Sequence, residues 1–376
     1  MGSIGAASRG CGVTDATLVV VAGTTETAAI DGISAAGADP ALRTKTPSAD
    51  LEIVADGRPA SDLPVPISPS GCPTPAVVTR AVRELVGFEF VGVDAGLTAP
   101  TTAEPLLDSG AAPGGDVRDS QPVPDAAAVF EKARSLATNT VEEAAAGSVA
   151  FGGSEPDELL LAETIPGGTT TALGVLTALG ERPIVSSSLA TNPLETKRAV
   201  VAEGMAASRL EPGDAAGDPV AAVRQMGDPV LAAAVGLVVG AVERGIDVTL
   251  AGGTQLAAVA ALARHAGVDR RLPLATTAFV ENDPTTDLDT LAADLHLTLI
   301  ATDPGFDASD HPAMQAYARG EAKEGVGMGG ALALGDRAGV PAAALRERVA
   351  AITDRLLAER EPVTATATSD DGGNER

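Results

Sequence analysis

The feature that most constrains how this chain can fold is a repeated order of segments along it. A short, continuously apolar run is followed by a turn with glycine or aspartate, and the turn by a stretch with helical spacing of apolar residues. Such runs occur at residues 18–21, 88–93, 159–162, 248–251 and 297–301. Continuous rather than alternating hydrophobicity is typical of strands covered on both faces, as in parallel sheets.

Helical segments between these runs support a parallel arrangement. Residues 171–179 place apolar side chains on one stripe, and residues 256–263 are mostly alanine, leucine and valine. Strands that alternate with helices predict an α/β fold with a doubly wound, mostly parallel sheet, flanking helices and a small helical accessory region. A ligand site is then expected beyond the carboxyl ends of the strands, where the glycine-rich turns gather.

A single large α/β domain is expected over residues 17–360. Residues 101–125 are rich in proline, glycine and aspartate, and are predicted to form a loop insertion. Apolar residues at helical spacing predict a C-terminal helix at residues 341–359. Residues 1–16 are expected to be a flexible N-terminus, and residues 361–376 a disordered tail.

The chain is strongly acidic, with 51 Asp and Glu residues against 26 Lys and Arg residues and a net charge of −25. Such a field disfavours nucleic acid and anionic membranes as partners, because both need basic patches. Hydrophobic residues make up 45% of the chain, which argues against acidic disorder. We therefore expect a folded protein of a halophilic cytoplasm, where salt shortens the Debye length to about 3 Å at about 1 M.

Export, membrane insertion and metal binding are not indicated. The first twelve residues lack the apolar segment of a signal peptide. The longest apolar stretch, at residues 230–242, is too short to span a bilayer. Cys11 and Cys72 lie far apart without a CxxC spacing, which predicts buried thiols in a reducing, cytoplasmic compartment. No metal site and no cofactor are expected.

A glycine- and threonine-rich turn follows the run at residues 159–162 and opens a helix. It reads Glu163-Thr164-Ile165-Pro166-Gly167-Gly168-Thr169-Thr170-Thr171. Glycines permit close backbone approach, and the free N–H groups of a helix N-terminus attract anions. Since the chain has only four lysines, phosphate is expected to bind largely through such backbone groups. The alternative is a turn that only joins strand to helix; the segment is neither a P-loop nor a dinucleotide fingerprint.

A second turn, at residues 323–331, places Glu324 beside four glycines in six positions. Glycine N–H groups are suited to a phosphate, and the carboxylate to a basic nitrogen. The alternative is a flexible turn in which Glu324 is solvated and idle. Gly252 and Gly253 form a third turn, for which ligand contact and tight strand–helix packing are equally consistent with the sequence.

The segment at residues 68–75, with its cysteine, gives weaker evidence for a catalytic site. In the segment at residues 68–75, Thr74 as N-cap and Pro75 as first helical residue explain the prolines as a helix start. Cys72 has no nearby histidine to activate it as a nucleophile.

The three histidines have no metal-binding spacing. His265 closes a predicted helix and His296 starts a predicted strand, so neither is expected to be catalytic. His311 lies 13 residues before Glu324 and is a candidate to line the same mouth.

Taken in order, the segments resemble one family. They lie at residues 24–27, 32–37, 68–75, 166–173, 186–188, 192–195, 251–255 and 323–327. This order is similar to the archaeal branch of the nicotinate-nucleotide:dimethylbenzimidazole phosphoribosyltransferase family (CobT-type), over residues 17–335.

Two motifs of the bacterial branch of this family have counterparts here. Its Gly-Glu/Asp-Met-Gly-Ile-Gly-Asn-Thr-Thr motif matches residues 162–170, with Glu163 at the acidic position. Glu324 takes the place of the catalytic glutamate in its Gly-Glu-Gly-Thr/Ser-Gly-Ala turn. Pro166 and Gly168 replace a glycine and an asparagine, and the bacterial Pro-Pro-Gly-Ser-Leu segment has no counterpart, which leaves the exact substrate contacts open.

The resemblance implies transfer of phosphoribose from nicotinate mononucleotide to 5,6-dimethylbenzimidazole, giving nicotinate and α-ribazole 5′-phosphate for the lower nucleotide of cobamides. It implies Glu324 as the base that takes the acceptor's N–H proton, and Glu163 as the residue that orients the acceptor. The other expected substrate contacts, several of them around the phosphate, are Gly167, Gly168, Thr169, Thr170, Gly252, Gly253, Gly325, Gly327, Gly329 and His311.

A homodimer is also expected from the resemblance. Two alternatives stay open: a phosphoribosyltransferase for another acceptor, such as adenine or a phenol, and a nucleotide-binding protein of the same fold without turnover.

Overall fold

A computed structural model describes residues 16–34, 40–60, 63–68, 70–138 and 158–358. The flexible N-terminus expected up to residue 16 lies outside the described residues except for Ala16, and the tail expected at 361–376 lies wholly outside them. The same holds for Cys11.

A seven-stranded sheet forms the centre of the described molecule, in the order β3-β2-β1-β4-β5-β6-β7 with parallel neighbours throughout. Its strands are β1 (Ala16–Ala22), β2 (Glu89–Asp94), β3 (Leu106–Asp108), β4 (Glu158–Thr164), β5 (Asp247–Ala251), β6 (Pro273–Thr277) and β7 (Thr298–Thr302). All five predicted runs form strands. Two strands were not predicted: β3 is three residues long and lies inside the expected loop at 101–125, and β6 is short and ends in two threonines.

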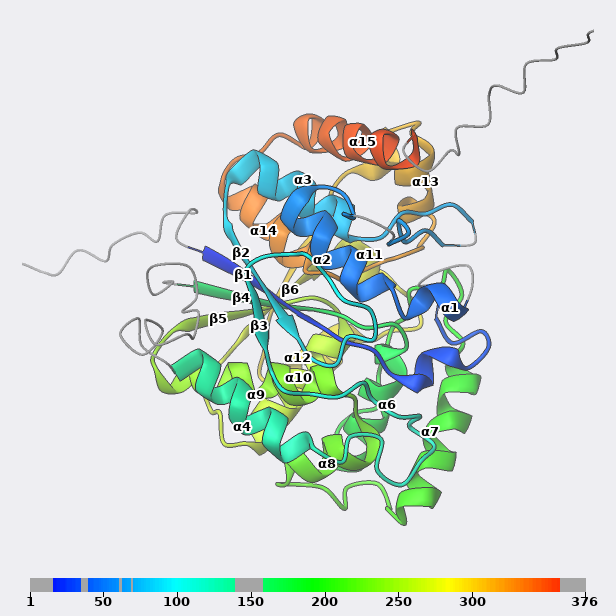
Figure 1. The fold of residues 1–376 in the computed structure, drawn as a ribbon, viewed down its shortest axis with the longest axis vertical. Helices are drawn as coiled ribbons and strands as arrows, with labels where there is room; N and C mark the ends of the chain where they lie inside the picture. The colour runs from blue at the N-terminus through cyan, green and yellow to red at the C-terminus, as the bar shows by residue number, and fades with distance from the viewer. Residues whose placement is uncertain (1–15, 35–39, 61–62, 69, 139–157, 359–376) are drawn as a thin grey trace, which may run out of the picture.

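Helices cover both faces of this sheet (Figure 1). Those on one face are α2 (Thr46–Asp56), α3 (Ala76–Val86), α11 (Ala278–Glu281), α13 (Pro312–Ala318), α14 (Met328–Arg337) and α15 (Ala342–Ala358). Those on the other are α4 (Ala126–Thr138), α6 (Gly168–Leu179), α7 (Leu194–Ser208), α8 (Pro219–Met226), α9 (Pro229–Glu243), α10 (Thr254–His265) and α12 (Leu288–Asp294). The short helices η2 (Glu26–Ala29), α1 (Pro40–Arg43) and η3 (Phe306–Ala308) lie in connections.

Each face of the sheet has its own apolar core. Along β1, Val19 and Val21 pack into the core with α9 and α10, whereas Leu18 and Val20 pack into the core with α3 and α14. Successive side chains of a strand point to opposite faces, so a continuous apolar run is what two cores require. The expected doubly wound α/β fold is confirmed.

Several local expectations can be compared with the elements. The helix expected at 341–359 is α15, which buries Leu345, Val349, Ile352 and Leu356. The long apolar stretch at 230–242 lies in α9, an interior helix. Among the described residues, no helix combines the length and hydrophobicity needed to cross a membrane. The third helix, α3, begins one residue later than expected, with Pro75 as its N-cap.

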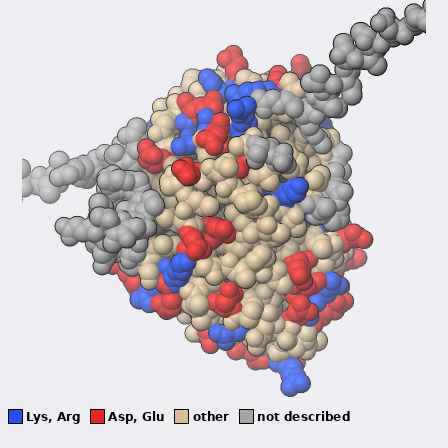
Figure 2. Space-filling view, in the orientation of Figure 1, with Lys and Arg blue, Asp and Glu red and all other residues tan. Residues whose placement is uncertain are grey.

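Basic side chains on the surface lie next to acidic ones, as Figure 2 shows for one face of the molecule. Arg348 and Arg80 both bind Glu84, and Arg134 binds Glu243. The Arg134–Glu243 pair is exposed, whereas Arg80 and Glu84 are half-buried, and exposed pairs contribute little to stability. Their effect here is to neutralise basic groups locally, which leaves the excess acidic charge to dominate the long-range field.

The order of the strands determines where a ligand can bind. From β1 the sheet extends through β2 and β3 on one side and through β4 to β7 on the other, so the direction of winding reverses between β1 and β4. Ligands of open α/β sheets bind beyond the carboxyl ends of the strands at such a point. Glu163 and Thr164 end β4 here, in register with Val21 and Ala22 of β1.

Candidate active site

A cleft of about 940 Å³, its open mouth included, lies beyond these strand ends. Its walls come from segments that are far apart in the sequence: Thr46 and Asp50 of α2, residues 66–68 and 72–75 before α3, residues 163–169 at the end of β4 and just after it, residues 186–188, residues 253–255 after β5, and residues 322 and 324–326 before α14. The cleft thus joins both helical layers across the top of the sheet.

Most of the expected site residues meet at this cleft. Glu324, Glu163, Gly167, Gly168, Thr169, Gly253 and Gly325 line it. Gly252, Thr170, Gly327 and Gly329 do not line it; each belongs to one of the turns or helix starts that do. Glu324 and the turn at 167–169 therefore share one cleft.

His311 lies elsewhere, and the expectation that it shares this mouth is not met. It caps α13, where Nδ1 accepts from the Ala313 N–H, and Nε2 lies 3.1 Å from the Asp354 carboxylate on α15. The short helix α13 lies between His311 and Glu324 in the chain and separates His311 from the cleft. Cys72 does line the cleft, but burial raises the pKa of its thiol well above the usual range, so it stays protonated.

The Glu324 carboxylate is held by the start of α14. Oε1 accepts from the N–H groups of Gly325 at 3.1 Å and Gly329 at 3.0 Å, and Oε2 lies 3.4 Å from the hydroxyl of Thr276 at the end of β6. A Cβ on Gly329 would lie 2.3 Å from the Thr276 backbone, so only glycine permits this approach. The Gly329 N–H thus binds Glu324 itself and is not free for the phosphate expected there.

A left-handed turn presents Glu324 to the cleft. Gly325, Val326 and Gly327 all have positive φ, at 137°, 54° and 74°. For a β-branched residue such as Val326 this is an unfavourable conformation, typical of functional sites. Two bonds hold it: the Val326 N–H donates to the Glu163 carbonyl at 2.8 Å, and the Thr79 hydroxyl donates to the Val326 carbonyl at 2.8 Å.

Both cleft glutamates have perturbed acidity. Burial raises the pKa of Glu324 to about 7, and the N–H groups of Gly329 and Gly325 offset part of that rise. Burial also raises the pKa of Glu163 to about 8, with a further rise from the negative charges of Asp228 and Glu324. At neutral pH Glu163 is therefore mostly protonated and Glu324 is poised to accept a proton, which is the pairing that acid–base chemistry requires.

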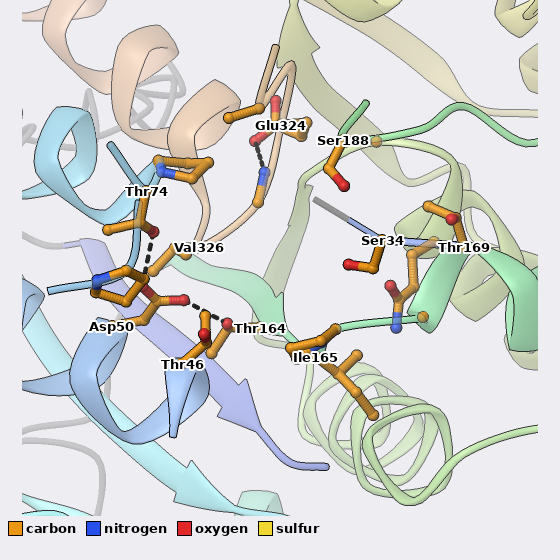
Figure 3. Close-up of a pocket in the computed structure, with 18 of the residues that line it drawn as sticks. Ser34, Thr46, Asp50, Thr74, Thr164, Ile165, Thr169, Ser188, Glu324 and Val326 are labelled. Carbon is orange, nitrogen blue, oxygen red and sulfur yellow. Dashed lines mark hydrogen bonds between the residues drawn. The ribbon is translucent and has the colours of Figure 1, made fainter. Parts of the chain in front are cut away.

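One end of the cleft is suited to an anion. The helices α6 and α10 both begin there, at Gly168 and Thr254, and the N-terminus of a helix carries partial positive charge. In α6 the N–H groups of Gly168 and Thr170 already donate to the carbonyls of Ile165 and Gly167. The first turns of the two helices are in contact at Gly168 and Gln255, because a Cβ on Gly168 would lie 2.1 Å from Gln255 Oε1. Gln255 is only 4% exposed, and its Nε2 has no hydrogen-bond partner in the described chain. Figure 3 shows the side chains of Ser34, Thr169 and Ser188 around the same space.

Two of the four lysines lie behind this end rather than in it. Lys197 Nζ donates to the Ser186 carbonyl at 2.6 Å, and Lys323 Nζ donates to the Leu189 carbonyl at 2.9 Å and pairs with Asp283. None of the described residues that line the cleft is Lys, Arg or His. An anion here would be bound by backbone and hydroxyl groups. The two buried lysines contribute only indirectly, through their hydrogen bonds to the backbone at Ser186 and Leu189.

The opposite end of the cleft combines an acid with apolar walls. Asp50 accepts from the hydroxyls of Thr74 and Thr164, both at 2.6 Å. Figure 3 places these three residues across the cavity from Ser34 and Thr169, with Glu324 between the two groups. The neighbouring walls are formed by Ile67, Cys72, Pro73, Pro75 and Val326.

Sequence reasoning missed Asp50, Thr164 and Gln255 as cleft residues. Gln255 directly follows the third glycine turn, so a helix start after a strand end was a usable signal for it. Asp50 carried no such signal, because an acid within a helix is ordinarily a solvated residue. Among the described residues, no group of three His, Cys, Asp or Glu side chains is arranged to hold a metal ion.

The fold is shared with two solved structures from Thermus thermophilus. One is a nicotinate-nucleotide-dimethylbenzimidazole phosphoribosyltransferase, with TM-score 0.55 and 19% identity, covering 93% of this chain and 83% of that one. The other is CobT, with TM-score 0.56 and 19% identity, covering 93% of this chain and 84% of that one. At this identity the likeness establishes the fold.

Sequence relatives are much closer. The chain is 56% identical over 347 residues to the UPF0284 protein of Halobacterium salinarum, covering 92% of this chain and 99% of that protein. It is 36% identical to the UPF0284 protein of Methanothermobacter thermautotrophicus over 92% of this chain and 95% of that protein, and 38% identical to that of Methanosarcina acetivorans over 89% and 93%. No protein-family model matches the chain.

These relatives agree with the archaeal and halophilic character expected from the acidic composition and the motif order. With more than half of the positions identical over almost the full length of the Halobacterium protein, the chain belongs to the UPF0284 protein family.

Proposed function

We propose that this protein is a phosphoribosyltransferase that transfers phosphoribose from nicotinate mononucleotide to a benzimidazole-type base such as 5,6-dimethylbenzimidazole, releasing nicotinate. One observation carries the proposal: a carboxylate with a pKa raised to about 7, Glu324, shares a cleft with two helix N-termini at Gly168 and Thr254. The fold common to the Thermus phosphoribosyltransferase supports it.

The phosphate of the donor binds at the anion-suited end of the cleft. The N–H groups that begin α6 and α10 supply partial positive charge there, and Gln255 Nε2 supplies an unpaired donor. This arrangement replaces the lysines and arginines that a phosphate site often has, which is consistent with a cleft lined without cations.

The bond changes need one base and no metal. A ring nitrogen of the acceptor attacks the anomeric carbon as the bond from that carbon to the pyridinium nitrogen breaks. The electron pair of that bond returns to the pyridine ring, so nicotinate leaves without protonation. The acceptor then carries a positive charge until its N–H proton is lost, and Glu324 takes this proton. Glu163 orients the acceptor, and because it is mostly protonated at neutral pH it does not compete with Glu324 for the acceptor's N–H proton.

In this proposal, the rate acceleration that does not come from Glu324 comes mainly from holding the two substrates in the right relative position. The donor is proposed to bind at the end of the cleft near Ser34 and Thr169, and the acceptor toward Asp50 and Thr74. Figure 3 shows Glu324 above the space between these two groups of residues. Two reactants fixed in line convert a bimolecular reaction into an effectively unimolecular one, which is worth roughly 7–11 kcal/mol in favourable cases.

The test is incubation of the purified protein with nicotinate mononucleotide and 5,6-dimethylbenzimidazole in molar KCl, with nicotinate and the new nucleotide quantified by chromatography. We expect both products in equal amounts. Binding of the mononucleotide without release of nicotinate, across a panel of benzimidazoles and purines, would instead identify a nucleotide-binding protein without turnover.

A further inference from the structure

Asp50 is a cleft residue to which the proposed reaction gives no role. It projects from α2, is 2% exposed and lines the cavity at the end away from the helix N-termini. Its Oδ1 and Oδ2 each accept one bond from a threonine hydroxyl, Thr74 on one side and Thr164 on the other. A carboxylate has about four acceptor positions, so each oxygen retains one for a ligand.

The fold does not need an acid at this position. Burial raises the pKa of Asp50 to about 7, the two threonine bonds lower it, and no cation of the described chain contributes. A buried carboxyl without a cationic partner costs stability, whereas an asparagine of the same shape would accept from one threonine hydroxyl and donate to the other. Uncompensated acids of this kind in a cleft are characteristic of ligand recognition.

The surroundings of Asp50 define the shape of that ligand. The cleft lining includes the apolar side chains of Ile67, Pro75 and Val326. Beside Asp50 it also includes Thr46, Thr74 and Thr164, and the hydroxyls of Thr74 and Thr164 are already bound to Asp50. A flat ring system fits such walls, with one edge toward Glu324 and the remote edge toward Asp50. The remote edge then meets an acceptor of hydrogen bonds rather than apolar surface.

We propose that Asp50 selects the acceptor base, and that the preferred acceptor is a heteroaromatic base with an amino or hydroxyl donor on the edge remote from the attacking nitrogen, such as a purine amine or an amino- or hydroxybenzimidazole. The inference rests on the proposed function and narrows its substrate class. A dimethyl edge would cover the Asp50 carboxyl without replacing its bonds to water, and leaving one such group unpaired lowers affinity by roughly 10- to 100-fold.

A matched pair of acceptors isolates this contact. 5-Aminobenzimidazole and 5-methylbenzimidazole differ only in an amino against a methyl group of similar size. For the wild-type protein we expect kcat/KM with nicotinate mononucleotide to be at least about 10-fold higher for the amino compound. Asp50→Leu is expected to bring the ratio close to one, and Asp50→Asn, which retains a carbonyl acceptor, is expected to keep part of it.

Controls separate recognition from folding. Asp56→Leu makes the same change at an exposed position at the end of the same helix and should leave the ratio unchanged. Thermal unfolding of each variant in molar KCl shows that it is folded. Equilibrium dialysis of the two bases against wild type and Asp50→Leu measures the same preference without turnover.

The outcomes are distinguishable. If no acceptor yields nicotinate, the proposed function fails, and the dialysis ratio still tests Asp50. If the wild type binds or uses the methyl compound as well as the amino compound, or if Asp50→Leu keeps the wild-type ratio, the assignment of Asp50 is overturned even though phosphoribosyl transfer stands.

Discussion

At the scale of single residues, the proposed chemistry depends on how Glu324 is held. Its carboxylate is bound by two glycine N–H groups and lies near a threonine hydroxyl, in a cleft that burial makes partly dry. The bonds stabilise the ionised form and burial destabilises it, so the pKa settles near neutrality at about 7. A base of this strength is effective at the pH of a cell.

The first prediction concerns Glu324→Gln. Glutamine keeps the shape and one acceptor for the Gly329 N–H but cannot take a proton, so kcat should fall by roughly 10²–10⁴-fold, the usual contribution of one positioned base. Affinity for nicotinate mononucleotide, measured by calorimetry, should stay within a few-fold. Glu281→Gln, at an exposed position at the end of α11, serves as the matched control. Unchanged turnover in Glu324→Gln would remove Glu324 from the mechanism.

The second prediction is a pH profile. Glu324 acts as a base only when ionised, so kcat/KM should rise as pH increases through about 7. Glu163 leaves the acceptor's N–H proton to Glu324 only while it is itself protonated, so kcat/KM should fall as pH increases through about 8. Glu163→Gln mimics the protonated acid at every pH. The variant should therefore lose the alkaline limb and keep the acid limb, and a profile identical to wild type would exclude Glu163 from the reaction.

At the scale of elements, two helix N-termini create the anion-suited end of the cleft. The helices α6 and α10 follow adjacent strands, β4 and β5, so the parallel sheet brings their first turns to the same edge. The contact of Gly168 with Gln255 requires glycine at the first position of α6, since a Cβ there would overlap the glutamine amide.

The third prediction tests this pair of helices through Gln255→Ala. Loss of a hydrogen bond to a charged group is worth roughly 1.5–3 kcal/mol, so affinity for nicotinate mononucleotide should fall at least about 10-fold. Affinity for nicotinate riboside, which lacks the phosphate, should not change. Gln315→Ala on α13, whose side chain binds the Ser309 carbonyl outside the cleft, is the control. An equal loss of affinity for both ligands would show that Gln255 does not bind the phosphate.

At the scale of the whole molecule, the net charge of −25 governs stability. Like charges on a compact surface repel one another, and salt screens that repulsion. The fourth prediction is therefore that the melting temperature rises steeply from dilute buffer to molar KCl. Sodium sulfate at matched ionic strength distinguishes screening from salting-out. Equal melting temperatures in dilute and molar KCl would contradict the halophilic interpretation.

For the molecule as a whole, the sequence predicted most of the strands and part of the candidate site. Five strands, the doubly wound parallel sheet and the glycine turns were predicted because a continuous apolar run is a local pattern. Burial on both faces holds for β1 but not for β7, whose residues are exposed or half-buried at the edge of the sheet. The strands β3 and β6 were missed because β3 has only three residues and β6, although as long as β5 and β7, begins with proline and ends in two threonines. Glu324 was found from its turn and its resemblance to a family, not from any contact.

By itself, therefore, the sequence determined the layered architecture, the acidic surface and the turns at which chemistry is expected, because each is written in neighbouring residues. Only the tertiary structure decided which turns share a cleft. It excluded His311, which is near Glu324 in the chain but faces α15, and it brought in Asp50 and Gln255, which lie far from Glu324 in the chain. The physical reason is that a cleft forms where strand order reverses, and strand order is a property of the assembled sheet.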